Sequence, residues 1–345
     1  MDIGNYRIDE KSQVFIIAEL SANHNQSKDV AIKTIQAAKE AGADAIKLQT
    51  YTPDTLTLDC HNEYFQIDHG TLWDGKTLYD LYQEAYTPWE WHKDLFEEAE
   101  RIGLICFSSP FDNTAVDLLE DLNAPAYKIA SFEIQDIPLI EYVASKGKPI
   151  ILSTGIATLD DIDLAISTCR KVGNNDIIVL KCTSSYPAPI SLANLKTLKD
   201  IRDRFNVLIG LSDHTIGNIV PSVATALGAR VIEKHFILDK VIGGPDAGFS
   251  LNPKEFKSMV EEVRSVEKVL GEVSYEISEK VEKNRKFARS LFVVKDVKKG
   301  DKFTSENVRS IRPGYGLHPK YYAEVIGSIA QMQIARGTPL AKEMY

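Results

Sequence analysis

The 345-residue sequence has no apolar run approaching the ~20 residues that a membrane-spanning helix needs, so we expect no membrane protein. Its first residues, MDIGNYRIDEKSQ, are polar and acidic and lack the pattern of a signal peptide. Four scattered cysteines form no CxxC pair and suit reduced thiols better than a disulfide framework: Cys60, Cys106, Cys169 and Cys182. These features predict a cytoplasmic protein. The net charge of −9 argues against general nucleic-acid binding.

Short runs rich in Ile, Val, Leu and Ala recur along the first 240 residues and predict strands buried on both faces, as in a parallel sheet. The runs are 14–20, 45–50, 105–111, 126–131, 149–155, 177–184, 207–215 and 231–238. Helix-patterned stretches lie between them, among them 28–42, 88–103, 159–171, 216–228 and 253–269. Eight alternating strands and helices predict a (β/α)₈ TIM barrel. A doubly wound sheet is the competing fold, but the turn after 14–20 reads SANHNQS, without the glycines that bind a nucleotide.

The pattern predicts three parts: a catalytic barrel over 1–270, a charged helical linker over 271–285, and a small β-rich module over 286–345. A long aromatic segment, 51–87, follows the second strand, where barrel loops build the active site. Residues 285–320 hold ten Lys/Arg against three Asp/Glu, although the whole chain is acidic. This basic segment can dock onto the acidic body of its own chain or a partner. Two differently solvated surfaces are the alternative.

Polar side chains end many of the predicted strands, and in a barrel these ends converge on one mouth. Lys47 and Lys128, together with several serines, predict a small, strongly anionic substrate, because ammonium groups and hydroxyls bind phosphate and carboxylate oxygens. The alternative is that each lysine pairs with a carboxylate of the barrel wall. Strand alternation puts Ser131 and Glu133 on one face of their strand.

Two successive strands end on histidine: LSDHTIG contains His214 and VIEKHF contains His235. Neutral imidazole suits Mn²⁺, Zn²⁺, Co²⁺ or Fe²⁺, and two histidines without a nearby cysteine predict an open Lewis-acid site. Asp246, in GGPDAGFS, can reach the same mouth or be a turn residue. The alternative for the histidines is hydrogen bonding within the core.

A metal-dependent barrel hydrolase is a competing class of enzyme. It would also use two histidines, but it usually has more carboxylate ligands and needs no lysine pair.

Several motifs, in order along the chain, resemble the sialic acid synthase family: FIIAELSANHNQS, GADAIKLQTY, YKIASFE, STGIAT, LSDHTIG, VIEKHF, GGPDAGFS and RPGYG. The tail resembles that family's antifreeze-like (SAF) domain, which alone would also suit a carbohydrate-binding or ice-binding protein. The resemblance implies a transferase that condenses phosphoenolpyruvate (PEP) with an N-acylated amino sugar. Segments such as ELSANHNQS and KLQTYTPDTLT are most similar to the members that make pseudaminic acid. The alternative is a member that makes N-acetylneuraminate or legionaminate, from N-acetylmannosamine or a related sugar.

The resemblance also implies roles for individual residues. The residues implied to bind PEP are Lys47, Ser109, Lys128, Ser131, Ser153, Ser184 and Ser212. Two of them depart from the neuraminate synthase pattern, since threonine is usual at Ser109 and asparagine at Ser184. His214 and His235 are implied to hold a divalent cation (Mn²⁺, Mg²⁺ or Co²⁺) and to act in catalysis with Glu133. The residues implied to contact the sugar are Glu19, Gln49, Tyr186, Asp246 and Arg312, the last from the partner of a domain-swapped homodimer.

Overall fold

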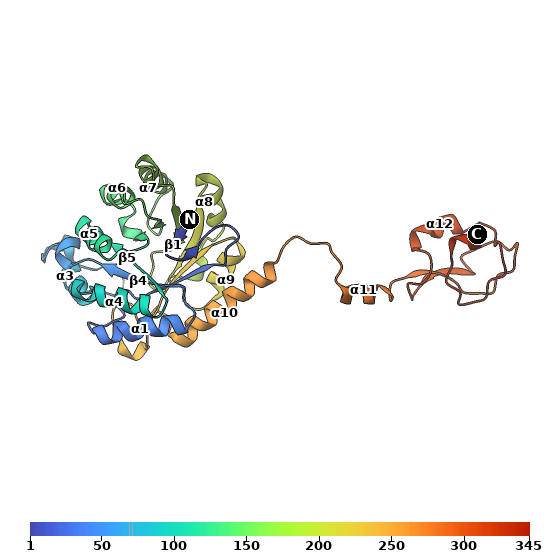
Figure 1. Ribbon diagram of the computed structural model, residues 1–345, viewed down its shortest axis with the longest axis horizontal. Helices are drawn as coiled ribbons and strands as arrows, with labels where there is room; N and C mark the ends of the chain where they lie inside the picture. The colour runs from blue at the N-terminus through green and yellow to red at the C-terminus, as the bar shows by residue number, and fades with distance from the viewer. Residues whose placement is uncertain (69, 71) are drawn as a thin grey trace. The chain divides into compact units, whose positions relative to one another are not determined.

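The computed structural model describes residues 1–68, 70 and 72–345, which divide into two compact units, Met1–Gly271 and Glu272–Tyr345. The first unit is a closed barrel of eight parallel strands surrounded by helices (Figure 1). Around the barrel the strands run in the order β10-β3-β4-β5-β6-β7-β8-β9. Within the described part of the chain, no helix combines the length and the apolar character that crossing a bilayer requires.

The eight barrel strands agree with the eight runs predicted from sequence. They are β3 (Phe15–Glu19), β4 (Ala45–Thr50), β5 (Ile105–Pro110), β6 (Tyr127–Ile129), β7 (Ile150–Ser153), β8 (Ile177–Cys182), β9 (Leu208–Asp213) and β10 (Val231–His235). The run 126–131 is shorter than predicted, because Ser131–Glu133 forms a 3-10 helix after the strand. Ser131 and Glu133 are therefore not alternating strand residues.

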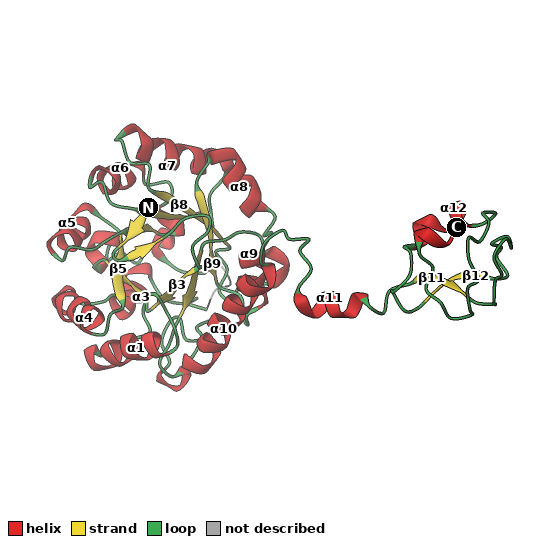
Figure 2. Ribbon diagram, turned by 45° about the vertical axis from the view of Figure 1, so that its right-hand side comes forward, coloured by secondary structure: helices red, strands yellow, loops and turns green. Residues whose placement is uncertain are grey.

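Helices follow the barrel strands and form an outer layer (Figure 2). They are α1 (Lys28–Glu40), α4 (Trp89–Arg101), α5 (Asn113–Asp121), α6 (Ile137–Ser145), α7 (Leu159–Lys171), α8 (Thr197–Phe205), α9 (Ile219–Ala226) and α10 (Pro253–Leu270). Local capping sets several of their starts. The side chain of Asn252 accepts a hydrogen bond from Glu255 N at the start of α10, and Pro253 occupies the first turn, where no backbone donor is needed.

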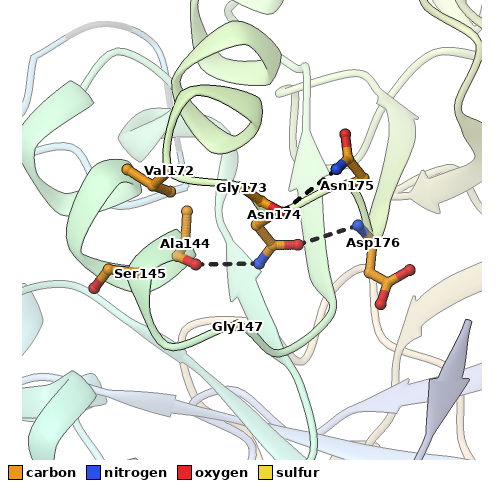
Figure 3. Close-up of a pocket in the computed structure, with 8 residues that line it drawn as sticks. All are labelled: Ala144, Ser145, Gly147, Val172, Gly173, Asn174, Asn175 and Asp176. Atoms are coloured by element: carbon orange, nitrogen blue, oxygen red, sulfur yellow. Dashed lines mark hydrogen bonds between the residues drawn. The ribbon is translucent and has the colours of Figure 1, made fainter.

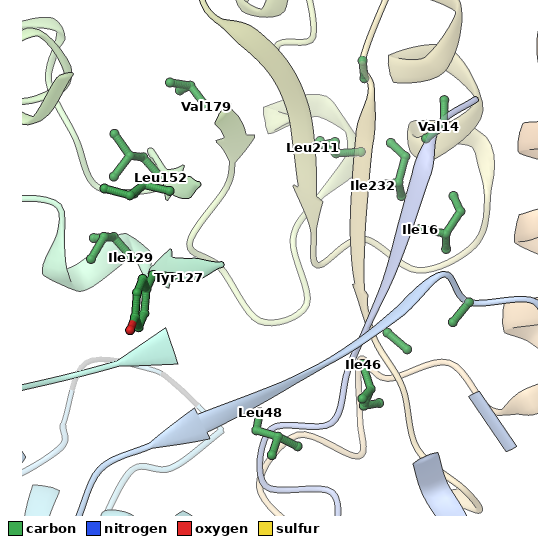
Figure 4. Packing of buried hydrophobic residues seen from close by; sticks show 14 of the residues in the cluster. Val14, Ile16, Ile46, Leu48, Tyr127, Ile129, Leu152, Val179, Leu211 and Ile232 are labelled. Atoms are coloured by element: carbon green, nitrogen blue, oxygen red, sulfur yellow. The ribbon is translucent and has the colours of Figure 1, made fainter. Parts of the chain in front are cut away.

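Strand alternation divides the core of the barrel unit into two apolar clusters. Residues such as Ile16, Leu48, Leu211 and Ile232 point outward and pack under the helices (Figure 4). Phe15, Ile17 and their neighbours point inward at the amino ends of the strands. The N-terminal hairpin, β1 (Asp2–Ile3) and β2 (Tyr6–Arg7), adds Ile3 to this inner cluster. The amino end of the barrel is thus filled with apolar side chains, and the carboxyl end is left for polar ones.

The inserted segment 51–87 contains α2 (Pro53–Leu56) and α3 (Leu78–Ala85).

The second unit holds α11 (Glu279–Arg285), a two-stranded sheet of β11 (Ser290–Val293) and β12 (Val308–Ile311), and α12 (Tyr322–Val325). Its own small core includes Val293, Phe303 and Leu340. Of the predicted helical linker 271–285, only Glu279–Arg285 is helical.

Candidate active site

A cavity of about 540 Å³ opens at the carboxyl ends of the barrel strands. Most of the side chains predicted from sequence line it: Glu19, Lys47, Gln49, Lys128, Ser131, Glu133, Ser153, Tyr186, Ser212, His214, His235 and Asp246. Two more are adjacent to it, since Lys47 Nζ donates to Ser109 Oγ at 3.1 Å, and Ser184 Oγ lies beside Gly155. Arg312 is exposed in the second unit.

Two buried lysines and two buried carboxylates form a charged cluster that lines the cavity. Lys47 Nζ lies 2.5 Å from Glu19 Oε2 and 3.9 Å from Glu233 Oε2. Lys128 Nζ lies 3.7 Å from Glu233 Oε1, which also accepts a hydrogen bond of 3.0 Å from Ser212 Oγ. The lysines therefore do contact wall carboxylates, as the alternative predicted, and they also line a cavity.

The pKa values in this cluster follow from burial and pairing. Burial raises the pKa of Glu19, and Lys47 only partly opposes this. Burial acts to raise the pKa of Glu233 as well, but Lys128 and Lys47 bring it below its usual value. Burial lowers the pKa of Lys128. Glu233 was not among the predicted site residues, although it alternates with His235 on β10, and that alternation was the signal that could have found it.

Serine hydroxyls and a glycine surround one side of the lysine cluster. Gly155 N donates to Ser131 Oγ at 3.1 Å, and a Cβ at Gly155 would lie 2.0 Å from Ser184 Oγ. Ser153 Oγ is buried and has no hydrogen-bond partner among the described residues. A buried hydroxyl without a partner is unusual, so this group is placed to bond to a ligand.

Glu133 ends the 3-10 helix Ser131–Glu133 at the edge of the same cavity. Its Oε2 is buried and has no hydrogen-bond partner among the described residues. Burial raises the pKa of Glu133 to about 7, although Lys128 opposes the shift. A carboxyl with a pKa near neutrality can both accept and return a proton at the working pH.

His214 and His235 face one another from the ends of neighbouring strands, with ring centroids 5.2 Å apart. His214 Nδ1 lies 3.1 Å from Thr183 O and 3.8 Å from Cys182 Sγ. His235 Nδ1 lies 3.6 Å from Asp246 Oδ2, beyond hydrogen-bond reach, and is buried without a partner among the described residues. Cys182 is a neighbour that the sequence analysis did not predict.

Aromatic rings form the outer wall of the cavity. The Tyr186 ring lies 4.5 Å from that of His214 and 5.6 Å from that of Trp73, between centroids. The inserted segment contributes Trp73, whose Nε1 donates to Pro245 O at 3.2 Å, and Tyr82, whose ring lies 5.7 Å from that of Tyr51. The predicted aromatic segment therefore does line the site.

A smaller cavity, of about 340 Å³, lies at the turns before β7 and β8, at the other end of the strands (Figure 3). Its polar groups bond mainly to one another: Asn174 Nδ2 donates to Ala144 O at 3.2 Å, and Asp176 N donates to Asn174 Oδ1 at 3.1 Å. These bonds hold two turns together, so the cavity at the carboxyl ends remains the candidate active site.

Comparisons with known proteins show which family the chain belongs to. A model of the NeuB family matches residues 34–275, and one of the SAF domain matches residues 288–345. The chain is 52% identical over 340 residues to the pseudaminic acid synthase of Campylobacter jejuni, covering 99% of this chain and 98% of that protein. It is 36% identical over 334 residues to the N,N'-diacetyllegionaminic acid synthase of Legionella pneumophila, covering 95% of this chain and 94% of that protein. An N-acetylneuraminic acid synthetase structure from Leptospira borgpetersenii superposes with a TM-score of 0.73 at 32% identity, covering 82% of this chain and 94% of that chain. The chain therefore belongs to the NeuB family.

Proposed function

We propose that this enzyme condenses PEP with 2,4-diacetamido-2,4,6-trideoxy-L-altrose to give pseudaminic acid and phosphate. Two observations support this reaction: the 52% identity to the Campylobacter jejuni pseudaminic acid synthase, and a cavity that joins two lysines, a carboxyl with a raised pKa and two facing histidines. The cavity is the observation that carries the chemistry. The alternative substrate is N-acetylmannosamine or a legionaminic acid precursor. The 36% identity to the Legionella enzyme is the observation that favours this alternative.

In this proposal PEP binds among Lys47, Lys128 and the serine hydroxyls. The ammonium groups balance the charge of the phosphate and carboxylate, and the hydroxyls donate hydrogen bonds. Ser153 Oγ gains a partner in this way. The hydroxyls proposed for these contacts are those of Ser109, Ser131, Ser153, Ser184 and Ser212.

The two histidines fit a divalent cation, which we propose to be Mn²⁺, Mg²⁺ or Co²⁺. The hydrogen bond from His214 Nδ1 to Thr183 O assigns the lone pair of that ring to Nε2, and His235 keeps a buried nitrogen without a partner among the described residues. Within residues 1–68, 70 and 72–345, no three His, Cys, Asp or Glu side chains gather at a metal-binding distance, so water and substrate would complete the site. When bound, the cation supplies a Lewis acid beside the sugar aldehyde.

Glu133 is the group proposed to move protons. C3 of PEP forms a bond to the aldehyde carbon of the open-chain sugar, and water adds to C2 of PEP. Glu133 takes a proton from that water and returns it to the new sugar hydroxyl. The C2–O bond to phosphate then breaks, the remaining hydroxyl proton of the added water leaves with the phosphate, and the oxygen of that water becomes the keto oxygen, so one water is consumed and one hydrogen phosphate released.

Sugar recognition is proposed to combine polar and aromatic groups. Glu19, Gln49, Asp246 and Tyr186 are proposed to contact the sugar's hydroxyl and acetamido groups, and all four line the cavity. The rings of Tyr51, Tyr82 and Phe111 form an apolar surface suited to the methyl group of a 6-deoxy sugar.

We also propose that the enzyme works in the cytoplasm as a homodimer that exchanges its second units. Arg312 of one subunit then reaches the sugar's acyl group in the partner's cavity. The net positive charge of residues 285–320 against an acidic chain supports this arrangement. The four cysteines, all free in the described part of the chain, support a reducing compartment.

Phosphate release tests the proposed function. The protein is incubated with PEP and either the 6-deoxy-diacetamido sugar or N-acetylmannosamine, each with and without a chelator. We expect rapid, chelator-sensitive release with the first sugar and at least a tenfold lower kcat/KM with the second. Preference for N-acetylmannosamine would overturn the sugar assignment. No release with either sugar, but hydrolysis of a test ester, would favour a barrel hydrolase instead.

A further inference from the structure

A buried ion pair joins the two residues that immediately precede the facing histidines in the chain. Asp213 and Lys234 are opposite each other in the β9–β10 pairing, and each precedes one of the histidines, His214 or His235. Their side chains meet at 2.5 Å, between Lys234 Nζ and Asp213 Oδ2, with exposures of 0% and 2%.

Strand alternation separates this pair from the cavity. Asp213 and Lys234 follow the outward-facing Leu211 and Ile232 by two residues, whereas Ser212 and Glu233 line the cavity. The ion pair therefore faces the helix layer, and no substrate in the cavity can contact it.

The pair also anchors the turn that follows His214. Lys234 Nζ donates to Thr215 O and, at 3.4 Å, to Gly217 O. Asp213 accepts from Thr215 N at 3.0 Å and from Thr215 Oγ1 at 3.1 Å. His214 is thus flanked on both sides by residues that this network fixes.

The position of the pair within the sheet explains why such an anchor is useful. The β9–β10 pairing ends at Asp213 and Lys234, whereas β10 remains paired with β3 through His235 and Glu19. Beyond Asp213, the backbone of His214 has no strand pairing with β10, and its carbonyl instead accepts a hydrogen bond of 2.9 Å from Ala188 N. A side-chain network at the last paired position can replace it.

Energetics argue against stability as the purpose of the pair. A buried ion pair is often no more stabilising than apolar side chains of similar volume, because both charges lose their hydration. We propose that Asp213 and Lys234 are positioning residues that set the spacing and orientation of His214 and His235 for a shared cation. This inference rests on the metal site of the proposed function.

Manganese binding by the variant Asp213→Asn/Lys234→Met tests the proposal. The double change removes both charges together, and asparagine keeps an acceptor for Thr215 N. The control is Glu120→Gln/Lys148→Met, which makes the same kinds of change at a half-buried 2.6 Å ion pair between α5 and the turn before β7. Mn²⁺ affinity is measured by titration calorimetry without substrates, and unfolding by urea is followed in parallel.

We expect the Kd for Mn²⁺ to rise about 10- to 100-fold in the double variant and to stay within about twofold in the control. A folded double variant that binds Mn²⁺ like the wild type would overturn the inference. Absence of Mn²⁺ binding by the wild type would instead overturn the proposed metal site.

If the double variant does not fold, the single variant Thr215→Val tests the proposal, because it removes only the hydroxyl bond to Asp213. We expect Thr215→Val to weaken Mn²⁺ binding measurably, and an unchanged Kd would reject the positioning role.

Discussion

Replacing Glu133 by glutamine should make the barrel more stable while removing its proposed proton-transfer group. The side chain is half-buried, its Oε2 is buried without a hydrogen-bond partner among the described residues, and burial raises its pKa to about 7 from an ordinary 4.5. A buried carboxylate of this kind is costly when ionised. Glutamine has nearly the same shape and no charge.

The magnitude and its pH dependence follow from the shift of about 2.5 pH units, at 1.36 kcal/mol per unit. Because the folded pKa is raised, the group costs nothing below pH 4.5, where both folded and unfolded chains bind the proton. The destabilisation grows between pH 4.5 and 7 and reaches about 3 kcal/mol above pH 7. Glu133→Gln should therefore gain under about 1 kcal/mol at pH 5 and about 3 kcal/mol at pH 8, relative to wild type.

Urea unfolding, without PEP and with a chelator, measures these differences. Trp73, Trp89 and Trp91 are the three tryptophans of the chain and all belong to the barrel unit, so their fluorescence reports its unfolding alone. Glu97→Gln, on the exposed face of α4, is the matched control. A Glu133→Gln protein that is less stable than wild type at pH 8, or whose advantage does not grow with pH, would refute the argument.

Three further outcomes are expected for catalysis. The wild-type kcat/KM should rise with pH through a limb near 7, because the ionised form of Glu133 accepts the proton, and the residual activity of Glu133→Gln should lack that limb. Lys128→Met should raise the KM for PEP about 10- to 100-fold, as expected for loss of a charged hydrogen-bond donor, which steady-state kinetics can check. Gly155→Ala should raise the KM for PEP several-fold and leave the Kd for Mn²⁺ unchanged, because its Cβ would come 2.0 Å from Ser184 Oγ and 2.6 Å from Ser131 Oγ. An unaltered KM would remove Lys128 from the PEP site in the first variant, and Ser131 and Ser184 in the second.

The barrel could be predicted from sequence because its strands are buried on both faces and therefore read as continuous apolar runs. The convergence of the strand ends followed from the fold, and it brought Lys47, Lys128 and the histidines into one cavity. The 3-10 helix Ser131–Glu133 could not be predicted, since a three-residue turn has no periodicity of its own.

Other parts of the site depend on contacts that no pattern encodes. Cys182 becomes a site residue only through its distance to His214, which residues far apart in the chain determine. The ion pair of Asp213 and Lys234 could not be predicted from sequence for the same reason, because its two residues come from different strands. The sequence indicated which residue types lie at the carboxyl end of the barrel, and the structure adds which of these side chains contact one another.

A crystal structure of the protein with Mn²⁺ and PEP tests the central claim most directly, with the metal located by its anomalous signal. The account predicts one manganese peak at bonding distance from a nitrogen of both His214 and His235, with the anionic groups of PEP against Lys47 and Lys128. A manganese ion that contacts neither ring, or PEP bound away from both lysines, would contradict it.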